Sequence, residues 1–417
     1  MANVLEDLNY RGLIKDYSNE EAVRKLLEQP TTIYCGFDPS ASSMHMGNFV
    51  MISLLMRLQK AGHRIIAVVG GATGMIGDPS GKSSERNLQT MDVLKHNTEC
   101  IKKQLERFID LSDPNKGILL NNYDWIAPMS TLDFLRDYGK YFNINYLLSK
   151  DIIASRLENG ISYTEFSYNI LQAIDFYTLY KKYDCFIQTG GSDQWGNLTS
   201  GLELIRKMEG TEAKAQAMTC NLLLRSDGKK FGKSEKGALY LDPEKTSPYQ
   251  LYQYFVNVTD EDAIKYLKVL TFLSKDEIET IAVDHFKNLG MRIGQKALAY
   301  EIVKTIHSKE KADEAVMMSE VLFKGDIKSL NKQQLEEVFS DLTVEVNGDL
   351  MLEDLLIAIK AASSKREARE FANGNSIMIN GEKVTDPTKV IKKSDSLFET
   401  YTVVRRGKKN YYLVKHI

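Results

Sequence analysis

The stretch TTIYCGFDPSASSMHMGNFVMISLLMRLQKAG at residues 31–62 joins a β-type run, a polar turn and a helical pattern. The run TTIYCGF is nearly continuously apolar, as expected of a strand that is covered on both faces of a sheet. Similar runs follow at 64–71 (RIIAVVGG), 117–123 (GILLNNY) and 184–191 (DCFIQTGG), and longer helical patterns separate them. This alternation predicts βαβ units around a parallel sheet, with ligands gathered where the strands end.

The pattern changes after about residue 246, where three helical stretches follow one another. The third begins at Ser274, which has Glu277 three residues on, the spacing of a capping box. Residues 349–417 are mixed, with two helical stretches and then two hairpins, and Asn380-Gly381 is a strong turn pair. We expect an α/β domain at 1–220, a Lys-rich loop region at 221–245, a helical domain at 246–325, a polar linker at 326–348 and a small α+β domain at 349–417.

Composition narrows the class of protein. The chain has 417 residues, of which 43% are hydrophobic, enough for two or three domains. No run approaches the roughly 20 apolar residues that span a bilayer, and the N-terminus has acids where a signal peptide would be basic and then apolar. The four cysteines form no CxxC pair, which argues against zinc or disulfides and favours a reduced, cytoplasmic protein.

The charges are distributed unevenly along the chain. The net charge is −2, yet residues 351–417 hold thirteen Lys/Arg against eight Asp/Glu, so the preceding residues carry −7. A basic C-terminal segment on an acidic body indicates a polyanionic partner.

The turn FDPSASSMHMGN at 37–48 leads directly into the helical pattern. A strand, a polar turn and a helix N-terminus bring backbone N–H groups and a positive dipole end together, which suits a phosphate. His45 can donate to a phosphate oxygen from this position, and Gly47 lets a nucleobase or ribose approach the backbone. Taken alone, a single His in such a place is more often a surface residue beside a capped helix.

A second segment, DGKKFGKSEKGA at 227–238, follows the strand-like CNLLL and is rich in Gly and Lys. Lys229, Lys230 and Lys233, with the hydroxyl of Ser234, are suited to neutralising a triphosphate, above all as pyrophosphate leaves. Such a run is more often a solvated turn, so its pairing with the HMGN turn carries the argument. The stretch GDPSGK at residues 77–82 is not a phosphate loop, because Ile76 occupies the position where that motif needs Gly.

The two segments together resemble the HIGH and KMSKS signatures of class I aminoacyl-tRNA synthetases, in the same order and with a similar separation. The departures from those signatures are Met46, Asn48, Phe231 and Gly232. Stretches similar to the bacterial tyrosyl-tRNA synthetase family cover the whole chain: YCGFDPS (34–40), VGGATGMIGDPSGKSSER (69–86), NNYDW (121–125), TEFSYNILQAIDF (164–176), QTGGSDQWGN (188–197) and KTSPYQLYQYF (245–255). The resemblance implies a Rossmann-like catalytic domain, an α-helical anticodon-binding domain and a small RNA-binding domain.

Tyr168, Gln172 and Asp175 lie at i, i+4 and i+7, on one face of a predicted helix. From the residues alone, this stripe is as well explained by a buried hydrogen-bond network or a wet surface. The resemblance implies an amino-acid pocket, in which Tyr168, Gln172 and Asp78 hold the ammonium. Asp175 and Tyr34 would bond the phenolic hydroxyl, and phenylalanine would leave that pair unpaired. The implied tyrosine-binding residues are Tyr34, Asp78, Tyr168, Gln172, Asp175 and Gln188.

The resemblance also implies the chemistry, in which the tyrosine carboxylate attacks the α-phosphate of ATP and displaces pyrophosphate. A carboxylate is already ionised at neutral pH, so catalysis rests on positioning and charge stabilisation rather than on a general base. ATP is a substrate, and Mg²⁺ would arrive with it, with no dedicated protein metal site evident. The implied catalytic residues are Ser40, His45, Lys82, Arg86, Lys230 and Lys233. The implied ATP contacts are Gly36, Asp38, His45, Gly47, Asn48, Gly191, Asp193, Gln194, Lys233 and Ser234.

The segment SKREAREFANGNSIMINGEKV at 364–384 resembles a small RNA-binding fold shared with a ribosomal small-subunit protein. Clustered cations neutralise phosphates without reading sequence, which suits a module that grips tRNA through its backbone. Without the resemblance, a solvated basic face is nearly as good an interpretation. The implied tRNA-binding residues are Lys365, Arg366, Arg369, Arg405, Arg406, Lys408 and Lys409. The family also implies a homodimer, although periodicity shows no interface.

Two other functions fit parts of the sequence. One is a tryptophanyl-type ligase, which should lack the pairing of Tyr34 with Asp175. The other is an RNA-binding protein that kept the synthetase scaffold without charging activity. Loss of the Lys-rich loop or of His45 would favour it, and neither is lost. The expected partners are therefore L-tyrosine, ATP and tRNA(Tyr), with no membrane.

Overall fold

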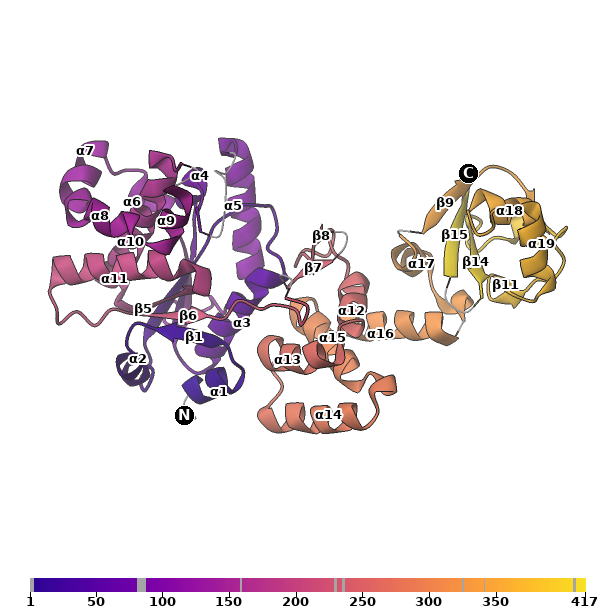
Figure 1. Cartoon of the computed structure of the whole chain (residues 1–417), viewed down its shortest axis with the longest axis horizontal. Coiled ribbons are helices and arrows are strands. Elements are labelled where there is room, and N and C mark those ends of the chain that lie inside the picture. Colours follow the sequence, from indigo (N-terminus) through magenta and orange to yellow (C-terminus); the bar gives the residue numbers. More distant parts are fainter. Residues whose placement is uncertain are drawn as a thin grey trace. The chain divides into compact units, whose positions relative to one another are not determined.

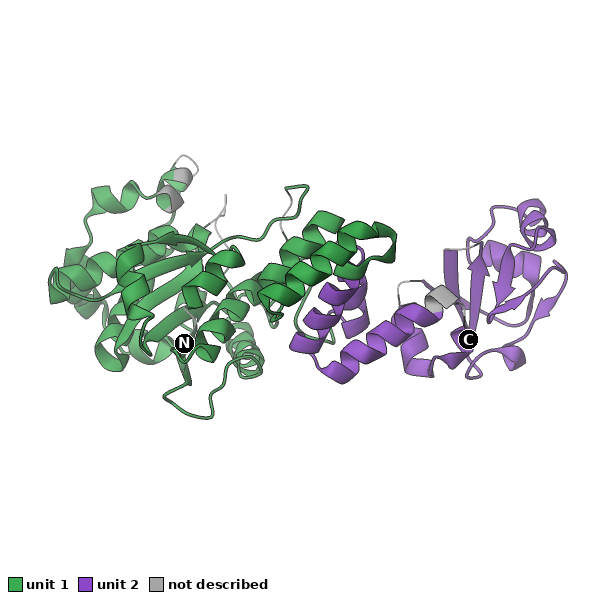
Figure 2. Cartoon of the chain, turned by 90° about the horizontal axis from the view of Figure 1, so that it is seen from below, with its two compact units in different colours: residues 1–245, 259–294 green, residues 246–258, 295–417 purple. Residues whose placement is uncertain are grey.

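The computed structural model describes residues 4–80, 88–157, 160–228, 231–234, 237–324, 326–340, 342–407 and 410–417. The chain divides into two compact units, which Figure 2 shows in different colours. Unit 1 comprises residues 1–245 and 259–294, and unit 2 comprises residues 246–258 and 295–417. Within the described residues, no helix is both long enough and apolar enough to cross a membrane.

Unit 1 is built on a six-stranded sheet with the order β1-β6-β5-β2-β3-β4. Strands β2 to β6 are mutually parallel, which confirms the predicted sheet, and β1 pairs antiparallel with β6 at one edge. The order reverses at β2, which lies between β3 and β5, and ligands of such sheets bind beyond the strand ends at this switch point. The strands are β1 (Ile14–Tyr17), β2 (Thr32–Phe37), β3 (Arg64–Val69), β4 (Gly117–Asn121), β5 (Cys185–Gly191) and β6 (Gln216–Cys220).

Helices cover both faces of this sheet, as Figure 1 shows. Ile66 and Val68 of β3 share a core with Phe176 of α10, while the equally buried Ile65 and Ala67 face the other way, because successive strand residues alternate. Burial on both faces explains why the strand sequences are continuously apolar. The helices are α1 (Val4–Tyr10), α2 (Glu20–Leu26), α3 (Met46–Lys60), α4 (Thr73–Ile76), α5 (Met91–Leu105), α6 (Tyr123–Ile126), α7 (Thr131–Asp133), α8 (Ile144–Leu148), α9 (Asp151–Leu157), α10 (Tyr163–Tyr183) and α11 (Trp195–Glu209).

The segment CNLLL, interpreted as a strand, lies mostly beyond β6, which ends at Cys220. Asn221 donates from its side-chain amide to the carbonyls of Gly12 and Ile14, which joins the residue after β6 to the start of β1. Leu222 is 54% exposed and therefore does not belong to a buried strand. A short ribbon follows, formed by β7 (Lys233–Ser234) and β8 (Gly237–Ala238).

Two helices of the expected helical domain belong to unit 1, namely α13 (Asp260–Leu270) and α14 (Lys275–Lys287). α13 packs against α3, and buried arginines bind the carbonyls at its C-terminal end. Arg11 donates to the carbonyls of Lys268 and Thr271 at 2.8 and 3.2 Å, and Arg57 also donates to the carbonyl of Thr271. The first segment of unit 1 ends at Lys245, beside the expected boundary at residue 246, and the chain returns to unit 1 at residues 259–294. The predicted capping box at the start of α14 is confirmed.

Unit 2 contains a five-stranded sheet with the order β12-β11-β14-β15-β9. Both predicted hairpins are present, and Asn380 and Gly381 form the first turn with φ angles of 49° and 83°. The helices are α12 (Pro248–Val256), α15 (Ile293–Ile306, which starts two residues before the unit), α16 (Lys309–Lys324), α17 (Lys332–Val338), α18 (Leu352–Ala358) and α19 (Lys365–Asn373). The strands are β9 (Thr343–Val346), β10 (Leu350–Met351), β11 (Ile377–Ile379), β12 (Glu382–Lys383), β13 (Val390–Ile391), β14 (Tyr401–Arg406) and β15 (Asn410–His416).

The structure differs from the expectation that residues 326–348 are a polar linker. This segment contains α17, and it contains β9, which pairs in parallel with β15. Leu335 and Phe339 are 0% and 1% exposed and pack with Val403 and Leu413 on one face of the sheet. Helices α18 and α19 cover the other face. The segment looked polar because only a few of its apolar side chains are needed to cover the sheet.

Candidate active site

The polar residues predicted to bind substrate follow the carboxyl ends of the strands around the switch point. Asp38 follows β2, Thr73 follows β3 and Asn122 follows β4, while α10 supplies Tyr168 and Asp175 from beside the sheet. Because parallel strands end at one edge, side chains far apart in the sequence converge there.

Asp38 lies at the centre of this edge. Its carboxylate accepts a hydrogen bond from the Tyr168 hydroxyl at 2.8 Å on one oxygen and from the Thr73 hydroxyl at 2.7 Å on the other. Gly70 makes the approach possible, since a Cβ there would lie 2.0 Å from Asp38 and 2.3 Å from Thr73. Gly70, which directly follows β3, is therefore required by the site.

Asp175 is buried on α10 and is held by two donors. Asn122 donates to one carboxylate oxygen at 3.0 Å and Trp125 Nε1 donates to the other at 2.8 Å, and Asn122 also donates to Thr73. Burial raises the pKa of Asp175 to about 7; the two donated hydrogen bonds lower it and the charge of Asp38 raises it further. A buried carboxylate near its pKa can accept a further hydrogen bond from a phenolic hydroxyl.

Tyr34 on β2 is 2% exposed and accepts a hydrogen bond of 3.0 Å from the side-chain amide of Gln188. Burial raises the pKa of the Tyr34 hydroxyl well above its usual value, and the charge of Asp175 adds to the rise. Tyr34 therefore stays neutral and keeps a proton to donate. The Gln188 side-chain oxygen is buried and lacks a hydrogen-bond partner among the described residues. Tyr34 and Asp175 together offer one donor and one acceptor.

Tyr168 lies among three carboxylates. Burial raises its pKa well above the usual value, and the charges of Asp38, Asp78 and Asp175 raise it further. Gln172, one turn along α10, has a buried side-chain oxygen without a partner in the described part of the chain. Carboxylates and an unpartnered amide oxygen gathered in one place suit a cationic ligand group such as an ammonium.

His45 is the N-cap of α3. Its Nδ1 accepts a hydrogen bond of 3.0 Å from the Gly47 N–H, and the Asn48 side chain accepts one of 3.0 Å from the His45 N–H. An accepting Nδ1 leaves the proton of the neutral ring on Nε2, which is a donor at the helix N-terminus. A Cβ on Gly47 would lie 2.8 Å from the His45 ring, so glycine is needed here. Asn48 acts as a cap in this structure, and its contact with ATP stays a prediction.

The Lys-rich loop returns directly to the HMGN turn. The Met46 N–H donates to the Leu239 carbonyl at 2.8 Å, and the Leu239 N–H donates to the Gly232 carbonyl at 2.9 Å. Gly232 has φ of +76°, and a Cβ there would lie 3.1 Å from Met46 Cβ and 3.2 Å from the Gly47 nitrogen. Phe231 packs on Tyr266 of α13 with ring centroids 4.8 Å apart. The two sequence signatures thus lie side by side in unit 1.

The remaining residues implied by the resemblance are located as follows. Gly36, Ser40, Gly191, Asp193 and Gln194 lie at the carboxyl ends of β2 and β5, where the Ser40 N–H donates to the Asp38 carbonyl at 2.8 Å. The backbones of Lys233 and Ser234 form β7. Lys82, Arg86, Lys230, Lys408 and Lys409 lie outside the described residues. Among the described residues, no group of three or more His, Cys, Asp or Glu side chains is placed to hold a metal ion.

Three residues in contact with this site were missed by sequence reasoning. Thr73, Asn122 and Trp125 hold Asp38 and Asp175 in place. Asn122 and Trp125 belong to the stretch NNYDW, which was matched to the family without a role. The one available signal was their place after an apolar run, where the residues of a parallel sheet meet a ligand.

The cations implied to bind tRNA are largely paired with acids of unit 2. Lys365 lies 2.6 Å from Asp354, Arg369 lies 2.6 Å from Glu353, and Arg366 lies 3.1 Å from Glu370. The pair of Arg366 with Glu370 is exposed on both sides and therefore weak, so a phosphate can compete for Arg366, whereas Glu353, the partner of Arg369, is buried. Arg405 and Arg406 stack on Tyr411 and Phe371 of the same unit.

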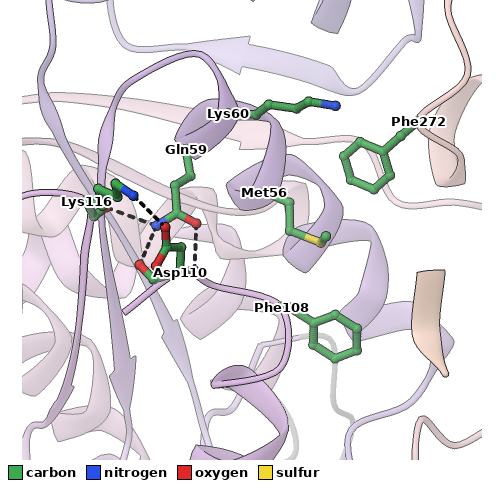
Figure 3. A pocket seen from close by; sticks show the side chains of 7 residues that line it. All are labelled: Met56, Gln59, Lys60, Phe108, Asp110, Lys116 and Phe272. Atoms are coloured by element: carbon green, nitrogen blue, oxygen red, sulfur yellow. Dashed lines mark hydrogen bonds and ion pairs between the residues drawn. The ribbon is translucent and has the colours of Figure 1, made fainter. Parts of the chain in front are cut away.

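A cavity of about 380 Å³ lies elsewhere in unit 1, toward the amino ends of β3 and β4. Figure 3 shows Gln59, Asp110 and Lys116 joined to one another on one side of it, with Phe108 and Phe272 on the other. Lys116 lies 3.0 Å from the Asp110 carboxylate, so these polar groups satisfy one another. The cavity lies by the amino ends of these strands, whereas Asp38 lies beyond the carboxyl end of β2. The cavity is therefore separate from the candidate active site.

The sheet, its switch point and the paired signatures define a class of enzyme. Residues 26–324 match the family described as tRNA synthetases class I (W and Y). Residues 333–414 match the C-terminal domain of the tyrosine–tRNA ligases. The fold alone is also shared with a tryptophanyl-tRNA synthetase of Encephalitozoon cuniculi, at 13% identity and a TM-score of 0.56 over 79% of this chain and 89% of that one.

Relatives of higher sequence identity indicate which amino acid this class I synthetase uses. Tyrosine–tRNA ligases of Listeria welshimeri and Bacillus caldotenax are each 48% identical over 99% of this chain and 100% of their own length. A C-terminally truncated mitochondrial tyrosyl-tRNA synthetase of Aspergillus nidulans is 31% identical, with a TM-score of 0.69 over 78% of this chain and 95% of that one. The chain belongs to the bacterial tyrosine–tRNA ligase family.

Proposed function

We propose that this enzyme activates L-tyrosine with ATP at the carboxyl edge of the unit 1 sheet and then transfers the tyrosyl group to the 3′ end of tRNA(Tyr). The observation that carries the choice of amino acid is the buried pair of Tyr34 and Asp175. A donor and an acceptor at the end of the site complement a phenolic hydroxyl, which donates to Asp175 and accepts from Tyr34. The full-length similarity to tyrosine–tRNA ligases favours this function over a tryptophanyl-type ligase and over an RNA-binding protein without charging activity.

The ammonium of the substrate binds at the other end of the site, among Asp78, Tyr168 and Gln172. Gln172 offers a buried oxygen without a partner among the described residues, and the charge of Asp78 reaches Tyr168. Gln188 orients Tyr34. Fixing both ends of tyrosine sets the position of its carboxylate, which is the nucleophile.

ATP binds where the strand ends meet the N-terminus of α3. His45 Nε2 and the positive dipole end of α3 stabilise negative charge on the phosphates. The positive charges of Lys82, Arg86, Lys230 and Lys233 would stabilise the leaving pyrophosphate, and Ser40, Asp38, Asp193 and Ser234 would complete the contacts. Mg²⁺ accompanies the triphosphate and neutralises part of its charge.

The activation step is tested by ATP–pyrophosphate exchange with tyrosine, phenylalanine or tryptophan as the driving amino acid. We expect exchange with tyrosine alone in the wild type and its loss in Asp175→Ala, because the variant leaves the phenol without its acceptor. A thermal melt of the variant checks that the fold persists. Exchange driven by tryptophan, or by none of the three, would overturn the proposal.

The tRNA binds through the cations of unit 2, namely Lys365, Arg366, Arg369, Arg405, Arg406, Lys408 and Lys409. The exposed pair of Arg366 with Glu370 supports this assignment, because such a pair exchanges readily for a phosphate contact.

The enzyme acts as a homodimer in the cytoplasm, where tRNA is charged for translation. Large apolar side chains are exposed on α7, α8 and the start of α10, with Leu132 76%, Ile144 65% and Tyr163 66% exposed. A second copy of the chain would bury them. Light scattering of the wild type and of Leu132→Glu with Tyr163→Glu tests this, and a monomeric wild type would refute it.

A further inference from the structure

Asn197, the third residue of α11, is a buried polar residue to which the resemblance gives no role. It is 0% exposed, and its side-chain amide must find partners inside the protein. Its oxygen accepts from the Asn169 side-chain nitrogen at 2.8 Å. Its nitrogen lies 2.9 Å from the Gln194 side-chain oxygen, 3.3 Å from the Ser80 hydroxyl and 3.4 Å from an oxygen of Asp78.

These contacts fix the direction of every amide in the network. The Gly196 carbonyl can only accept, so the nitrogen of Asn169 must face it, at 3.2 Å. The same nitrogen donates to Asn197, and the nitrogen of Asn197 must then face the oxygen of Gln194. The nitrogen of Gln194 is thereby directed to Asp78, at 2.7 Å.

Asp78 is the last acceptor in this network of hydrogen bonds. One of its oxygens accepts from Gln194, and the other accepts from the Ser80 N–H at 2.9 Å and faces Asn197. A carboxylate accepts about four hydrogen bonds, so these donors fix its orientation and leave capacity for an ammonium.

We propose that Asn197 is a positioning residue that holds the side chains of Gln194 and Asp78 in place, and through them sets the affinity for the ammonium of tyrosine. This inference rests on the proposed role of Asp78 as an ammonium ligand. In Asn197→Ala, the Gln194 oxygen loses its donor and Asp78 loses its contact with the Asn197 nitrogen, so both side chains are held less firmly in the orientation that binds an ammonium.

The test compares three ligands of Asn197→Ala by equilibrium binding. Tyramine keeps the ammonium and lacks the carboxylate, whereas 3-(4-hydroxyphenyl)propionate keeps the carboxylate and lacks the ammonium. We expect tyrosine and tyramine to bind about tenfold more weakly than to the wild type, while the propionate changes less than about twofold. Equal weakening of all three ligands would show a merely structural role, and unchanged tyrosine binding would also overturn the inference.

Three further variants complete the experiment. Asn97→Ala removes a 4% exposed asparagine that donates to the Pro39 carbonyl and does not touch Asp78, so it should leave the ratio of the three affinities unchanged. Asn197→Ser, which can still accept from Asn169, replaces the alanine variant if that one does not fold. Asp78→Asn separates the two proposals: if it does not weaken tyramine, the proposed role of Asp78 fails, and if it does while Asn197→Ala does not, the present inference alone fails.

Discussion

Tyrosine binding should weaken steeply below pH 7, because the free enzyme holds Asp175 with a pKa of about 7. In the proposed binding mode the phenolic hydroxyl donates to the ionised carboxylate, so a protonated Asp175 must release its proton before the ligand binds. At pH 6 about nine of ten free molecules are protonated, which raises the Kd about tenfold, and at pH 5 the factor is about a hundred. Tyrosine itself does not titrate between pH 5 and 8.

The measurement is isothermal titration of tyrosine at several pH values in two buffers of different ionisation enthalpy, which also counts protons. We expect release of about one proton per tyrosine at pH 6 and none at pH 8. Asp175→Asn, which keeps the shape but cannot titrate, should bind weakly with a Kd independent of pH. A wild-type Kd that stays flat from pH 8 to 5.5 would refute the reasoning.

The same shift has a consequence for stability. The folded pKa of Asp175 lies above the unfolded value of 3.8, so the native state binds the proton more tightly. Unfolding therefore becomes easier as pH rises from about 4 to about 7, and the dependence ends above pH 7. The shift of about three pKa units lowers the free energy of unfolding by at most roughly 4 kcal/mol between these pH values. Urea unfolding of both proteins without tyrosine should show this loss in the wild type and not in Asp175→Asn.

Three other changes have definite expected outcomes. Gly232→Ala forces a Cβ into a left-handed backbone 3.1 Å from Met46, at a cost of about 1–2 kcal/mol that favours release of the loop from the HMGN turn. The rate of pyrophosphate exchange should then fall about tenfold and Tm by no more than a few degrees, and an unchanged rate would contradict the packing of the loop on the turn. Ser274→Ala removes the cap of α14 and should lower the free energy of unfolding by about 1 kcal/mol, measured in urea against an exposed mid-helix substitution; no loss would show that the cap is dispensable. Arg366→Glu with Arg369→Glu should weaken tRNA binding and flatten its salt dependence in filter binding while leaving pyrophosphate exchange unchanged, and a matching loss of exchange would point to damaged folding instead.

Several features of the site could be read from the sequence because they depend on neighbouring residues. The apolar runs that became β2 to β5 are local patterns, and so are the stripe of Tyr168 and Asp175 on α10 and the capping box at Ser274. The HMGN turn also acts locally, since His45 caps the helix that its own sequence starts. Periodicity and capping are properties of a few consecutive residues, so folding elsewhere does not alter them.

The tertiary structure decided which residues meet. Nothing near Asp38 or Asp175 in the sequence shows that Thr73, Asn122 and Trp125 hold them, because these partners come from other strand ends. The same holds for α13, which looked like part of a separate helical domain and packs instead against α3. The sequence by itself determined the strands β2 to β5, the helix that carries Tyr168 and Asp175, and the chemical groups available, whereas it gave no sign of α17 and β9. The order of the strands, the burial that moves the pKa of Asp175 and the direction of each amide depend on contacts between distant segments, and these exist only once the chain has folded.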